Sequence, residues 1–353
     1  MTLPGIGNSI SFRQIRNEFG SVPTSPSGYS FGGYRISQEI SGSGLTLPLD
    51  DDIPTSGIVS FSDFHSKRLN VVVDCYSGGT ENRVNVKNAK WNNNQTIVVG
   101  GLTNRKEDGS RIRIAVNKKF GSQRGSVTNC ALRTGSWDST AQVVVEVAAN
   151  GKILGAGGDG GTGAQRVNNT GQDGQVGGGA LGIEASGTIV NVRSGGLILA
   201  GGGGGGGGGG QRETSGLWSD RKGSGGGGGG GAGLPPGLGA AGGSAGTAGS
   251  PGNAGSETSG GSGGGGGNNA NEAVGGTGGT GGNPGLAGGA GVRPSGGDGP
   301  DYPAPGQAGR WKNTPGGAGG AAGGAIRRTS GASFTIGTNN GTILGSTDQT
   351  GVT

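Results

Sequence analysis

The hydrophobic and polar residues of this 353-residue chain change their pattern twice along its length. Between residues 69 and 150, six short runs rich in valine and isoleucine alternate with turn residues such as SGG at 77–79 and EDG at 107–109. The run RIRIAV at 111–116 carries isoleucine or valine at every second position. A period of two is typical of a β-strand with one buried face. The pattern predicts an antiparallel β-sandwich or compact barrel over 69–150.

Residues 1–68 contain two copies of a helix-start pattern. Ser11 is followed three residues later by Gln14, and Ser60 is followed by Asp63 at the same spacing. This spacing is typical of a capping box, in which the two residues satisfy each other's free backbone amides. Apolar residues suited to a hydrophobic staple flank both boxes, so a short helix is expected after each.

The stretch between the two boxes, 21–57, is rich in serine, proline and glycine and has few apolar residues. We therefore expect 1–68 to be a docking module whose helices fold against a partner. The alternative is a small, self-contained helical cap. The candidate docking residues are apolar and belong to the two helix starts: Ile10, Phe12, Ile15, Phe19, Phe61 and Phe64.

Glycine sets the third pattern, which begins after residue 150. Of the 94 glycines, 77 lie in residues 151–353. Ten consecutive glycines occupy 201–210, and seven occupy 225–231. In 243–255 and 276–291, glycine recurs at every third residue.

A period of three matches an extended helix with three residues per turn and no internal hydrogen bonds. Every backbone N–H and C=O group of such a helix needs a partner, which neighbouring helices can supply if the backbones approach closely. Glycine permits this approach because it has no side chain. We therefore predict that 151–353 is a bundle of polyglycine-II helices with a collar of short β-strands. Collagen, the nearest alternative, requires an unbroken glycine register that this chain lacks.

The composition argues against an enzyme. Hydrophobic residues make up 29% of the chain and aromatic residues 4%, so one large apolar core is not expected. The one histidine, His65, lacks partners for a triad or a histidine-based metal site. Three acidic residues at 50–52 could hold Ca²⁺ weakly, but a solvated turn is the more common role of such a run. We expect no catalysis, metal or cofactor, and neither a signal peptide nor a membrane span.

The basic residues concentrate between Lys67 and Arg133, within a chain of net charge +5. The segment has no RNA-binding signature, so we expect no nucleic acid and place these cations on solvated faces or against an acidic neighbouring subunit. The two cysteines, Cys75 and Cys130, are expected to be reduced and buried, because no secretion signal accompanies them.

If the glycine clusters are rods, the segments between them form loops at the rod ends. The two longest loops, 211–224 and 292–315, combine tryptophan with arginine and lysine, which are common in binding surfaces. Four glycine clusters separate them, so an up-and-down path places both loops at one end. The candidate receptor-binding residues come from these two loops: Arg212, Trp218, Arg221, Lys222, Tyr302, Arg310, Trp311 and Lys312.

Glycine-rich rods that alternate with polar and aromatic loops over about 155–330 resemble the receptor-recognising tail-fibre adhesins of T-even-like phages. The resemblance implies a polyglycine-II sandwich whose tip loops bind an outer-membrane protein or lipopolysaccharide. It also implies a non-enzymatic virion protein, made in the host cytoplasm and oligomeric within the particle.

The N-terminal segments LPGIGNSISFRQIRNEFG and GIVSFSDFHSK resemble a short module of virion structural proteins of tailed phages. This resemblance implies docking on other virion proteins through 1–68. The alternative function is a purely structural virion subunit, such as a baseplate, neck or head-fibre component, without receptor binding.

Overall fold

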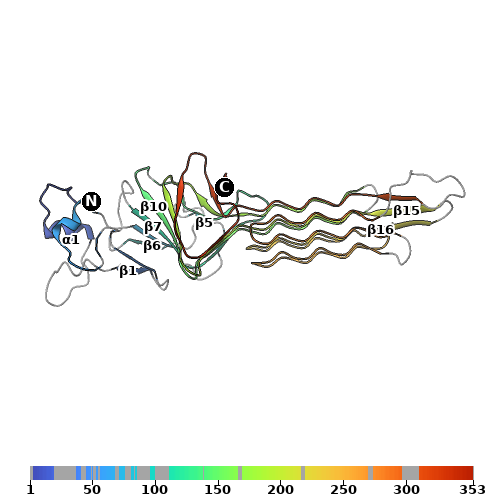
Figure 1. Cartoon of the computed structure of the whole chain (residues 1–353), viewed down its shortest axis with the longest axis horizontal. Helices are drawn as coiled ribbons and strands as arrows, with labels where there is room; N and C mark the ends of the chain where they lie inside the picture. Colours follow the sequence, from blue (N-terminus) through green and yellow to red (C-terminus); the bar gives the residue numbers. More distant parts are fainter. Residues whose placement is uncertain are drawn as a thin grey trace.

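The structure is a computed structural model of the whole chain. The molecule is elongated, with a small helical module at one end, a β-stranded body next to it and a long bundle of extended segments beyond (Figure 1). The residues that the structure describes are 3–19, 37–40, 45–48, 50, 53–54, 56–67, 71–75, 81–82, 84–85, 96–99, 111–137, 139–165, 169–215, 219–268, 273–295 and 310–352.

The β-stranded body is a three-sided coil, in which each circuit of the chain adds one strand to each of three sheets. The first sheet has the order β19-β13-β10-β7-β3-β6, the second β20-β14-β11-β8-β4 and the third β21-β18-β12-β9-β5. The strands, in chain order, are β3 (Val71–Cys75), β4 (Glu81–Asn82), β5 (Val84–Asn85), β6 (Thr96–Val99), β7 (Arg111–Val116), β8 (Lys119–Gly121), β9 (Cys130–Arg133), β10 (Gln142–Val147), β11 (Lys152–Leu154), β12 (Gly179–Ile183), β13 (Thr188–Val192), β14 (Leu197–Leu199), β18 (Ile326–Arg328), β19 (Phe334–Asn339), β20 (Thr342–Leu344) and β21 (Gln349–Thr350).

The predicted antiparallel sandwich over 69–150 is wrong. Apart from β6 and β7, which both belong to the first sheet, strands that follow each other along the chain enter different sheets. Each strand from β7 on pairs in parallel with the strand one circuit later, as β7 does with β10. Only β6, at the edge of the first sheet, pairs antiparallel with its neighbour among the described strands of the coil. The alternation of side chains identified the buried faces but carried no information about strand direction. All three sheets also continue past residue 150.

The coil has one apolar core, to which all three sheets contribute. As the alternation of β7 predicted, Ile112, Ile114 and Val116 are fully buried in it. Cys75 and Cys130 are also buried, and they form no disulfide with each other, as predicted. The core contains residues from before and after position 150, the boundary that the sequence pattern suggested.

The outer face of the first sheet also contains buried charges. Burial lowers the pKa of Arg113, an effect that the nearby carboxylates of Glu146 and Asp50 oppose. Glu146 Oε2 lies 3.4 Å from Arg193 Nη2, and Asp50 Oδ1 lies 3.1 Å from Arg111 Nη1. The side chain of Asp50 is 5% exposed, so the solvated turn expected at 50–52 is wrong for this residue. Its pairing ties the N-terminal part of the chain to the coil.

Three cations of the basic segment between Lys67 and Arg133 pair with acids of the same chain, which corrects the expectation of solvated faces or an acidic subunit for these three. Their partners lie beyond residue 150. The pairs are Lys119 with Glu257 (2.5 Å), Arg124 with Asp159 (2.9 Å) and Arg133 with Glu184.

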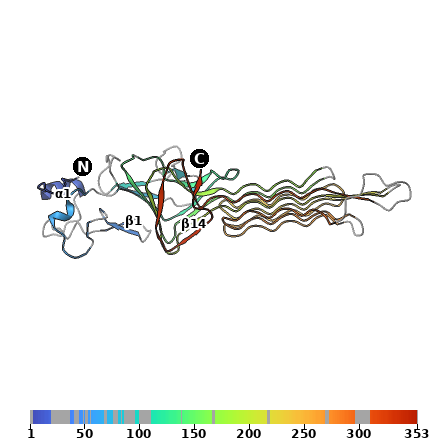
Figure 2. The ribbon, with the colours of Figure 1, turned by 45° about the horizontal axis from the view of Figure 1, so that its top comes forward.

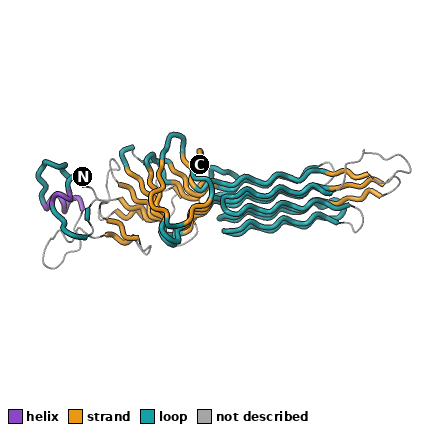
Figure 3. The backbone as a smooth tube through the Cα atoms, in the orientation of Figure 1, coloured by secondary structure: helices purple, strands orange, loops and turns teal. Residues whose placement is uncertain are grey.

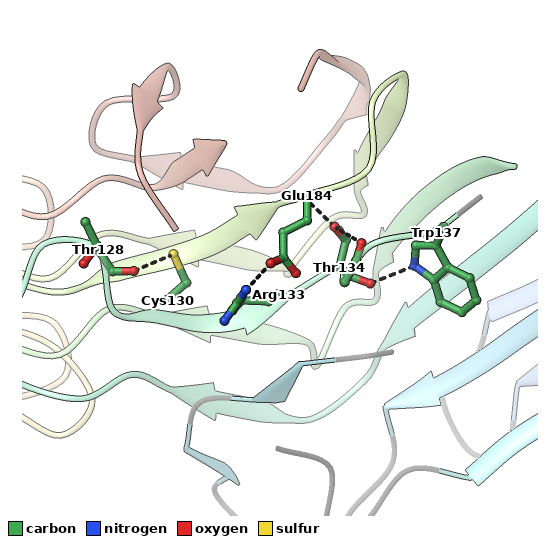
Figure 4. Close-up of polar contacts among 7 residues, drawn as sticks. Thr128, Cys130, Arg133, Thr134, Trp137 and Glu184 are labelled. Carbon is green, nitrogen blue, oxygen red and sulfur yellow. Dashed lines mark hydrogen bonds and ion pairs between the residues drawn. The ribbon is translucent and has the colours of Figure 1, made fainter. Parts of the chain in front are cut away.

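The Arg133–Glu184 pair belongs to a polar cluster at the end of β9 (Figure 4). Thr134 Oγ1 accepts a 2.9 Å hydrogen bond from the amide of Glu184, and the Thr134 carbonyl accepts one of 2.8 Å from the indole of Trp137. Trp137 packs against the apolar core. The cluster therefore fixes the corner between β9 and the following circuit.

The N-terminal module contains α1 (Phe12–Phe19) and the 3-10 helix η2 (Phe61–Phe64). Both predicted capping boxes form. The amide of Ser11 donates to Gln14 Oε1 at 2.8 Å, and the amide of Ser60 donates to Asp63 Oδ2 at 2.7 Å. Farther along, β1 (Ser37–Ile40) and β2 (Leu45–Pro48) form an antiparallel pair. Among the described residues, no helix has the length and hydrophobicity needed to cross a membrane.

Beyond the coil, the glycine-rich segments run side by side as rods, a term used here for each extended glycine-rich segment (Figures 2 and 3). They leave the coil at one corner, between β11 and β12 and again between β14 and β18. Two inserts at the same corner of successive circuits thus build one bundle. The rods are 155–165, 169–178, 200–210, 224–233, 237–243, 249–256, 260–267, 275–283, 286–293 and 314–324.

The hydrogen bonds of the run 201–210 repeat with a period of three. Three successive amides donate to three different rods: Gly204 to Gln175 (2.8 Å), Gly205 to Gly229 (2.8 Å) and Gly206 to Gly289 (3.0 Å). Three carbonyl groups accept from three further rods: Gly203 from Gly282, Gly204 from Gly320 and Gly205 from Gly161, each at 2.8 Å. This rod is therefore surrounded on all sides by backbone.

The glycine content of each rod follows its position in the bundle. All residues of 201–210 and 225–233 are buried, and these are the two central rods. In the outer rod 275–283, GGTGGTGGN, the exposed positions are Thr277 and Thr280 together with Asn283. A side chain is tolerated only where a rod faces solvent, which explains why the unbroken glycine runs are central.

Candidate functional site

The two loops predicted to carry binding residues meet at the far end of the rods, opposite the helical module (Figures 1 and 3). They form a three-stranded antiparallel sheet, here called the tip sheet, of β15 (Gln211–Ser215), β16 (Ser219–Gly223) and β17 (Arg310–Asn313). Strand β15 is central and pairs with both others. The prediction that the two loops share one end of the bundle is confirmed.

The number of rods between the two loops differs from the expected four. The clusters 237–255 and 275–291 each fold back on themselves, at 244–248 and at 284–285. The count becomes six, which is again even, so the loops still reach the same end. Nothing in the glycine periodicity marks these two reversals.

The strand register places cations in one row across the tip sheet. Arg212 on β15 stands directly opposite Lys222 on β16 and Lys312 on β17. Arg212 and Lys222 are half-buried, and Lys312 is exposed. In the next row, Glu213 stands between Arg221 and Trp311. Residues separated by about 90 positions in the sequence therefore share one small surface.

The remaining candidates lie partly outside the described residues. The backbones of Arg221, Arg310 and Trp311 belong to β16 and β17. Trp218 and Tyr302 fall outside the described ranges.

Gln211 anchors the base of the tip sheet, a role that sequence reasoning missed. Its side chain is buried, and Oε1 accepts a 2.7 Å hydrogen bond from the amide of Val274, while Nε2 donates to the Ser295 carbonyl at 3.3 Å. Beside it, Thr314 Oγ1 accepts a 2.8 Å bond from the amide of Gly210. One glutamine thus links the tip sheet to two other tip segments. Its only sequence signal is its place directly after the ten glycines.

The reversal at 244–248 adds a further segment to the tip. Its Ala245 carbonyl accepts a 2.5 Å hydrogen bond from Ser224 Oγ, and the amide of Thr247 donates to the Lys222 carbonyl at 3.0 Å. By contrast, the segments 234–236 and 256–259, which also connect rods, lie at the coil end. There, the Leu234 carbonyl accepts from the amide of Ser122, and Glu257 pairs with Lys119.

A second candidate surface lies on the N-terminal module. Ile15, Phe19 and Phe64, proposed for docking, are at most 4% exposed and form the module's own core with Leu3, Ile53 and Val59. The two helices contact each other directly: the ring centroids are 5.7 Å apart for Phe12–Phe61 and 5.8 Å for Phe19–Phe64.

Of the other docking candidates, Ile10 and Phe12 pack partly buried against this core, and Phe61 is 41% exposed. The sequence did not single out Ile6 and Ile58, which are each 90% exposed. These two isoleucines present more apolar side chain to solvent than any of the predicted residues.

Among the described residues, no group of three or more His, Cys, Asp or Glu side chains is arranged to hold a metal ion.

A comparison with protein-family models matched residues 80–348 to the phage tail fibre adhesin Gp38 family. The chain belongs to this family. The match includes most of the coil, the rods and the tip sheet of the adhesin, whereas the helical module precedes it. The resemblance of the glycine-rich half to tail-fibre adhesins is thus confirmed, and the protein is a component of the phage virion. Comparisons with curated proteins and with solved structures found no match.

Proposed function

We propose that this adhesin attaches the virion to its host by binding a cell-surface receptor, either a glycan or an outer-membrane protein, through the tip sheet and its loops. The observation that carries the proposal is the pairing of β15 with β17, which brings the two aromatic and cationic loops together at the end of the rods. Side chains presented by a rigid scaffold are the usual basis of a binding surface. Membership of the adhesin family supports the same role without catalysis.

We also propose that the rods are polyglycine-II helices. The period-three hydrogen bonds of 201–210 support this, because a helix with three residues per turn directs every third amide to the same neighbour. The described rods are joined by backbone hydrogen bonds, so we expect substitutions in the tip loops to leave the bundle unchanged.

The N-terminal module is proposed to dock on another virion protein, with the adhesin oligomeric within the particle. Support comes from its place at the end opposite the tip and from the exposed side chains of Ile6 and Ile58. We propose three functional parts: a docking module (1–68), a β-segment (69–150) and a rod bundle with the tip (151–353). The coil contains strands from both the second and the third part.

The test is competition for adsorption. Purified adhesin is incubated with host cells before the phage is added, beside a variant in which residues 213–221 are replaced by a short glycine-containing turn. We expect the parent protein to block adsorption and the variant to lose this effect while keeping its melting temperature. A parent protein that blocks nothing would favour a purely structural subunit, and equal blocking by both proteins would place the binding surface outside the hairpin.

A further inference from the structure

We infer that the receptor-binding surface includes tip segments outside the tip sheet, and that two buried residues, Gln211 and Ser224, hold these segments in place. The inference rests on the proposed function and names its positioning residues. The added segments are the reversal 244–248 and the chain at Val274 and at Ser295. Each lies at the tip end of a rod and is bonded to the base of the tip sheet.

The two central rods end at the tip in the same way. Gln211 directly follows the glycine run 201–210, and Ser224 directly precedes the run 225–231. The amides of 201–209 and 225–231 donate to backbone carbonyl groups of other rods. At Gln211 and Ser224, which are 4% and 1% exposed, a side chain bonds to another tip segment instead. A buried polar side chain therefore stands where the regular contacts of each central rod end.

Gln211 joins the tip sheet to two segments. Its Oε1 accepts a 2.7 Å hydrogen bond from the amide of Val274, and its Nε2 donates to the carbonyl of Ser295 at 3.3 Å. Gly223 stands opposite Gln211 on β16, and a Cβ atom there would lie 2.6 Å from the amide nitrogen of Gly275. The chain after Val274 thus passes directly against the backbone of β16. One side chain uses both its acceptor and its donor to hold two segments.

Ser224 joins the reversal to the end of β16. Its hydroxyl donates a 2.5 Å hydrogen bond to the carbonyl of Ala245. The amide of Thr247 donates to the carbonyl of Lys222 at 3.0 Å, and the amide of Ser224 donates to the carbonyl of Thr247 at 3.1 Å. A Cβ atom at Gly246 would lie 2.3 Å from the carbonyl oxygen of Lys222. The reversal is therefore packed backbone to backbone against the tip sheet.

Both anchors are buried polar groups, so their hydrogen bonds are costly to lose. The segments that they hold are fixed before a receptor arrives, and fixed groups lose less entropy when they bind. These segments present exposed side chains next to the tip sheet: Val274 is 43% exposed, and Ser244 and Ser295 are also exposed. A receptor that covers the tip sheet therefore meets these side chains as well.

The first experiment compares matched serine variants of the full-length adhesin. Ser224→Ala removes the bond to Ala245 at the tip, whereas Ser122→Ala removes a side-chain bond at the coil end, where Ser122 Oγ accepts from the amide of Ala156 at 2.6 Å. Both serines are 1% exposed. We expect Ser224→Ala to bind host cells about fivefold more weakly or worse, because the reversal is no longer fixed, and Ser122→Ala to bind like the parent. Equal binding by the two variants would overturn the role of Ser224.

The second experiment tests Gln211 by Gln211→Met, which keeps the length of the side chain and removes both of its hydrogen bonds. The amide of Val274 loses its acceptor, so we expect it to exchange hydrogen about tenfold faster or more. The amides of 201–209 should keep their protection, because their acceptors are backbone groups of other rods. Unchanged exchange at Val274 would show that Gln211 does not hold this segment.

The third experiment measures binding of Gln211→Met, Val274→Ser and the double variant to host cells. We expect each single change to weaken binding by about threefold to tenfold. The double variant should lose less than the product of the two single effects, because the glutamine acts through the segment that it positions. Effects that multiply fully, or a Gln211→Met variant that binds like the parent, would overturn the inference. If the parent binds no cells, the proposed function fails and the extended surface with it, while hydrogen exchange at Val274 still decides whether Gln211 holds the segment.

Discussion

The amide of Gly205 donates a 2.8 Å hydrogen bond to the carbonyl oxygen of Gly229, and these two residues join the two central rods. The amide of Gly229 in turn donates to Gly279 at 3.0 Å. In a hydrophobic core the equivalent contacts would be made by side chains. Here the backbones themselves are in contact, so the bundle depends on the absence of side chains at its centre.

The smallest possible side chain at Gly205 is therefore expected to destabilise the bundle. A Cβ atom there would lie 2.1 Å from the carbonyl oxygen of Gly279, so the two backbones must separate and lose hydrogen bonds. We expect Gly205→Ala to cost about 1–3 kcal/mol or more of stability, measured as a lower melting temperature.

Gly265 provides the matched control in an outer rod. A Cβ atom at this position would meet nothing within 4 Å. Gly265→Ala should leave stability unchanged or raise it by about 0.4–1 kcal/mol, because alanine restricts the unfolded chain. Equal destabilisation by the two substitutions would show that close backbone contact does not hold the rods together.

The sequence predicted the rods better than the coil, for a physical reason. In the rod 275–283, Gly276, Gly279 and Gly282 occupy buried positions, where other rods cover the backbone. The spacing of glycine therefore predicts which faces of a rod are covered, and so predicts the bundle. The alternation of β7 reports only which face of a strand is buried. The alternation does not indicate which strand pairs with β7. In an antiparallel sandwich the partner can follow after one tight turn, whereas here the partner, β10, follows after a full circuit of the coil.

Two ion pairs between distant residues should contribute differently to the stability of the protein, because one pair is more deeply buried than the other. The side chains of Arg133 and Glu184 are 16% and 8% exposed, whereas those of Lys119 and Glu257 are 33% and 37% exposed. Removing one partner of a largely buried pair leaves a charge without compensation. We expect Glu184→Ala to cost about 3 kcal/mol and Glu257→Ala less than about 1 kcal/mol in urea unfolding. Similar losses for both variants would contradict this ranking.

Two sets of variants in the N-terminal module should distinguish its folding from its docking. Phe64 is fully buried in the module core, so Phe64→Ala is expected to cost about 3–5 kcal/mol and to expose the module to limited proteolysis. The double variant Ile6→Ser and Ile58→Ser changes two side chains that are each 90% exposed, and it should resist proteolysis like the parent. We expect this folded variant to be missing from purified virions. Normal incorporation would place the docking surface elsewhere.

The candidate site could be predicted only in part. Tryptophan and cations in the two longest segments between the glycine clusters marked the loops that form the tip sheet, and the even number of clusters between them placed both loops at one end. The register that aligns Arg212 with Lys222 and Lys312 depends on how the strands pair, and the role of Gln211 depends on two segments that approach from other rods. Neither relationship leaves a local pattern in the sequence.

The last prediction concerns the tryptophans of the two loops. Trp311 is in register with Glu213 on the central strand, and Trp218 precedes β16 directly. We expect Trp218→Ala and Trp311→Ala each to weaken binding of the purified adhesin to host cells by about 1–3 kcal/mol, the usual range for an aromatic anchor. Their melting temperatures should stay close to that of the parent, because the rods are held by backbone hydrogen bonds.

The control for these variants is Leu238→Ala, which removes a side chain that is 54% exposed on an outer rod near the coil. The amide of Leu238 donates a 2.8 Å hydrogen bond to Asp159 Oδ1, and we expect the substitution to keep this bond because the donor is a backbone group. Leu238→Ala should bind cells like the parent. Should both tryptophan variants bind as tightly as this control, the receptor contacts other parts of the tip, such as 244–248, and the aromatic residues serve only to support the loops.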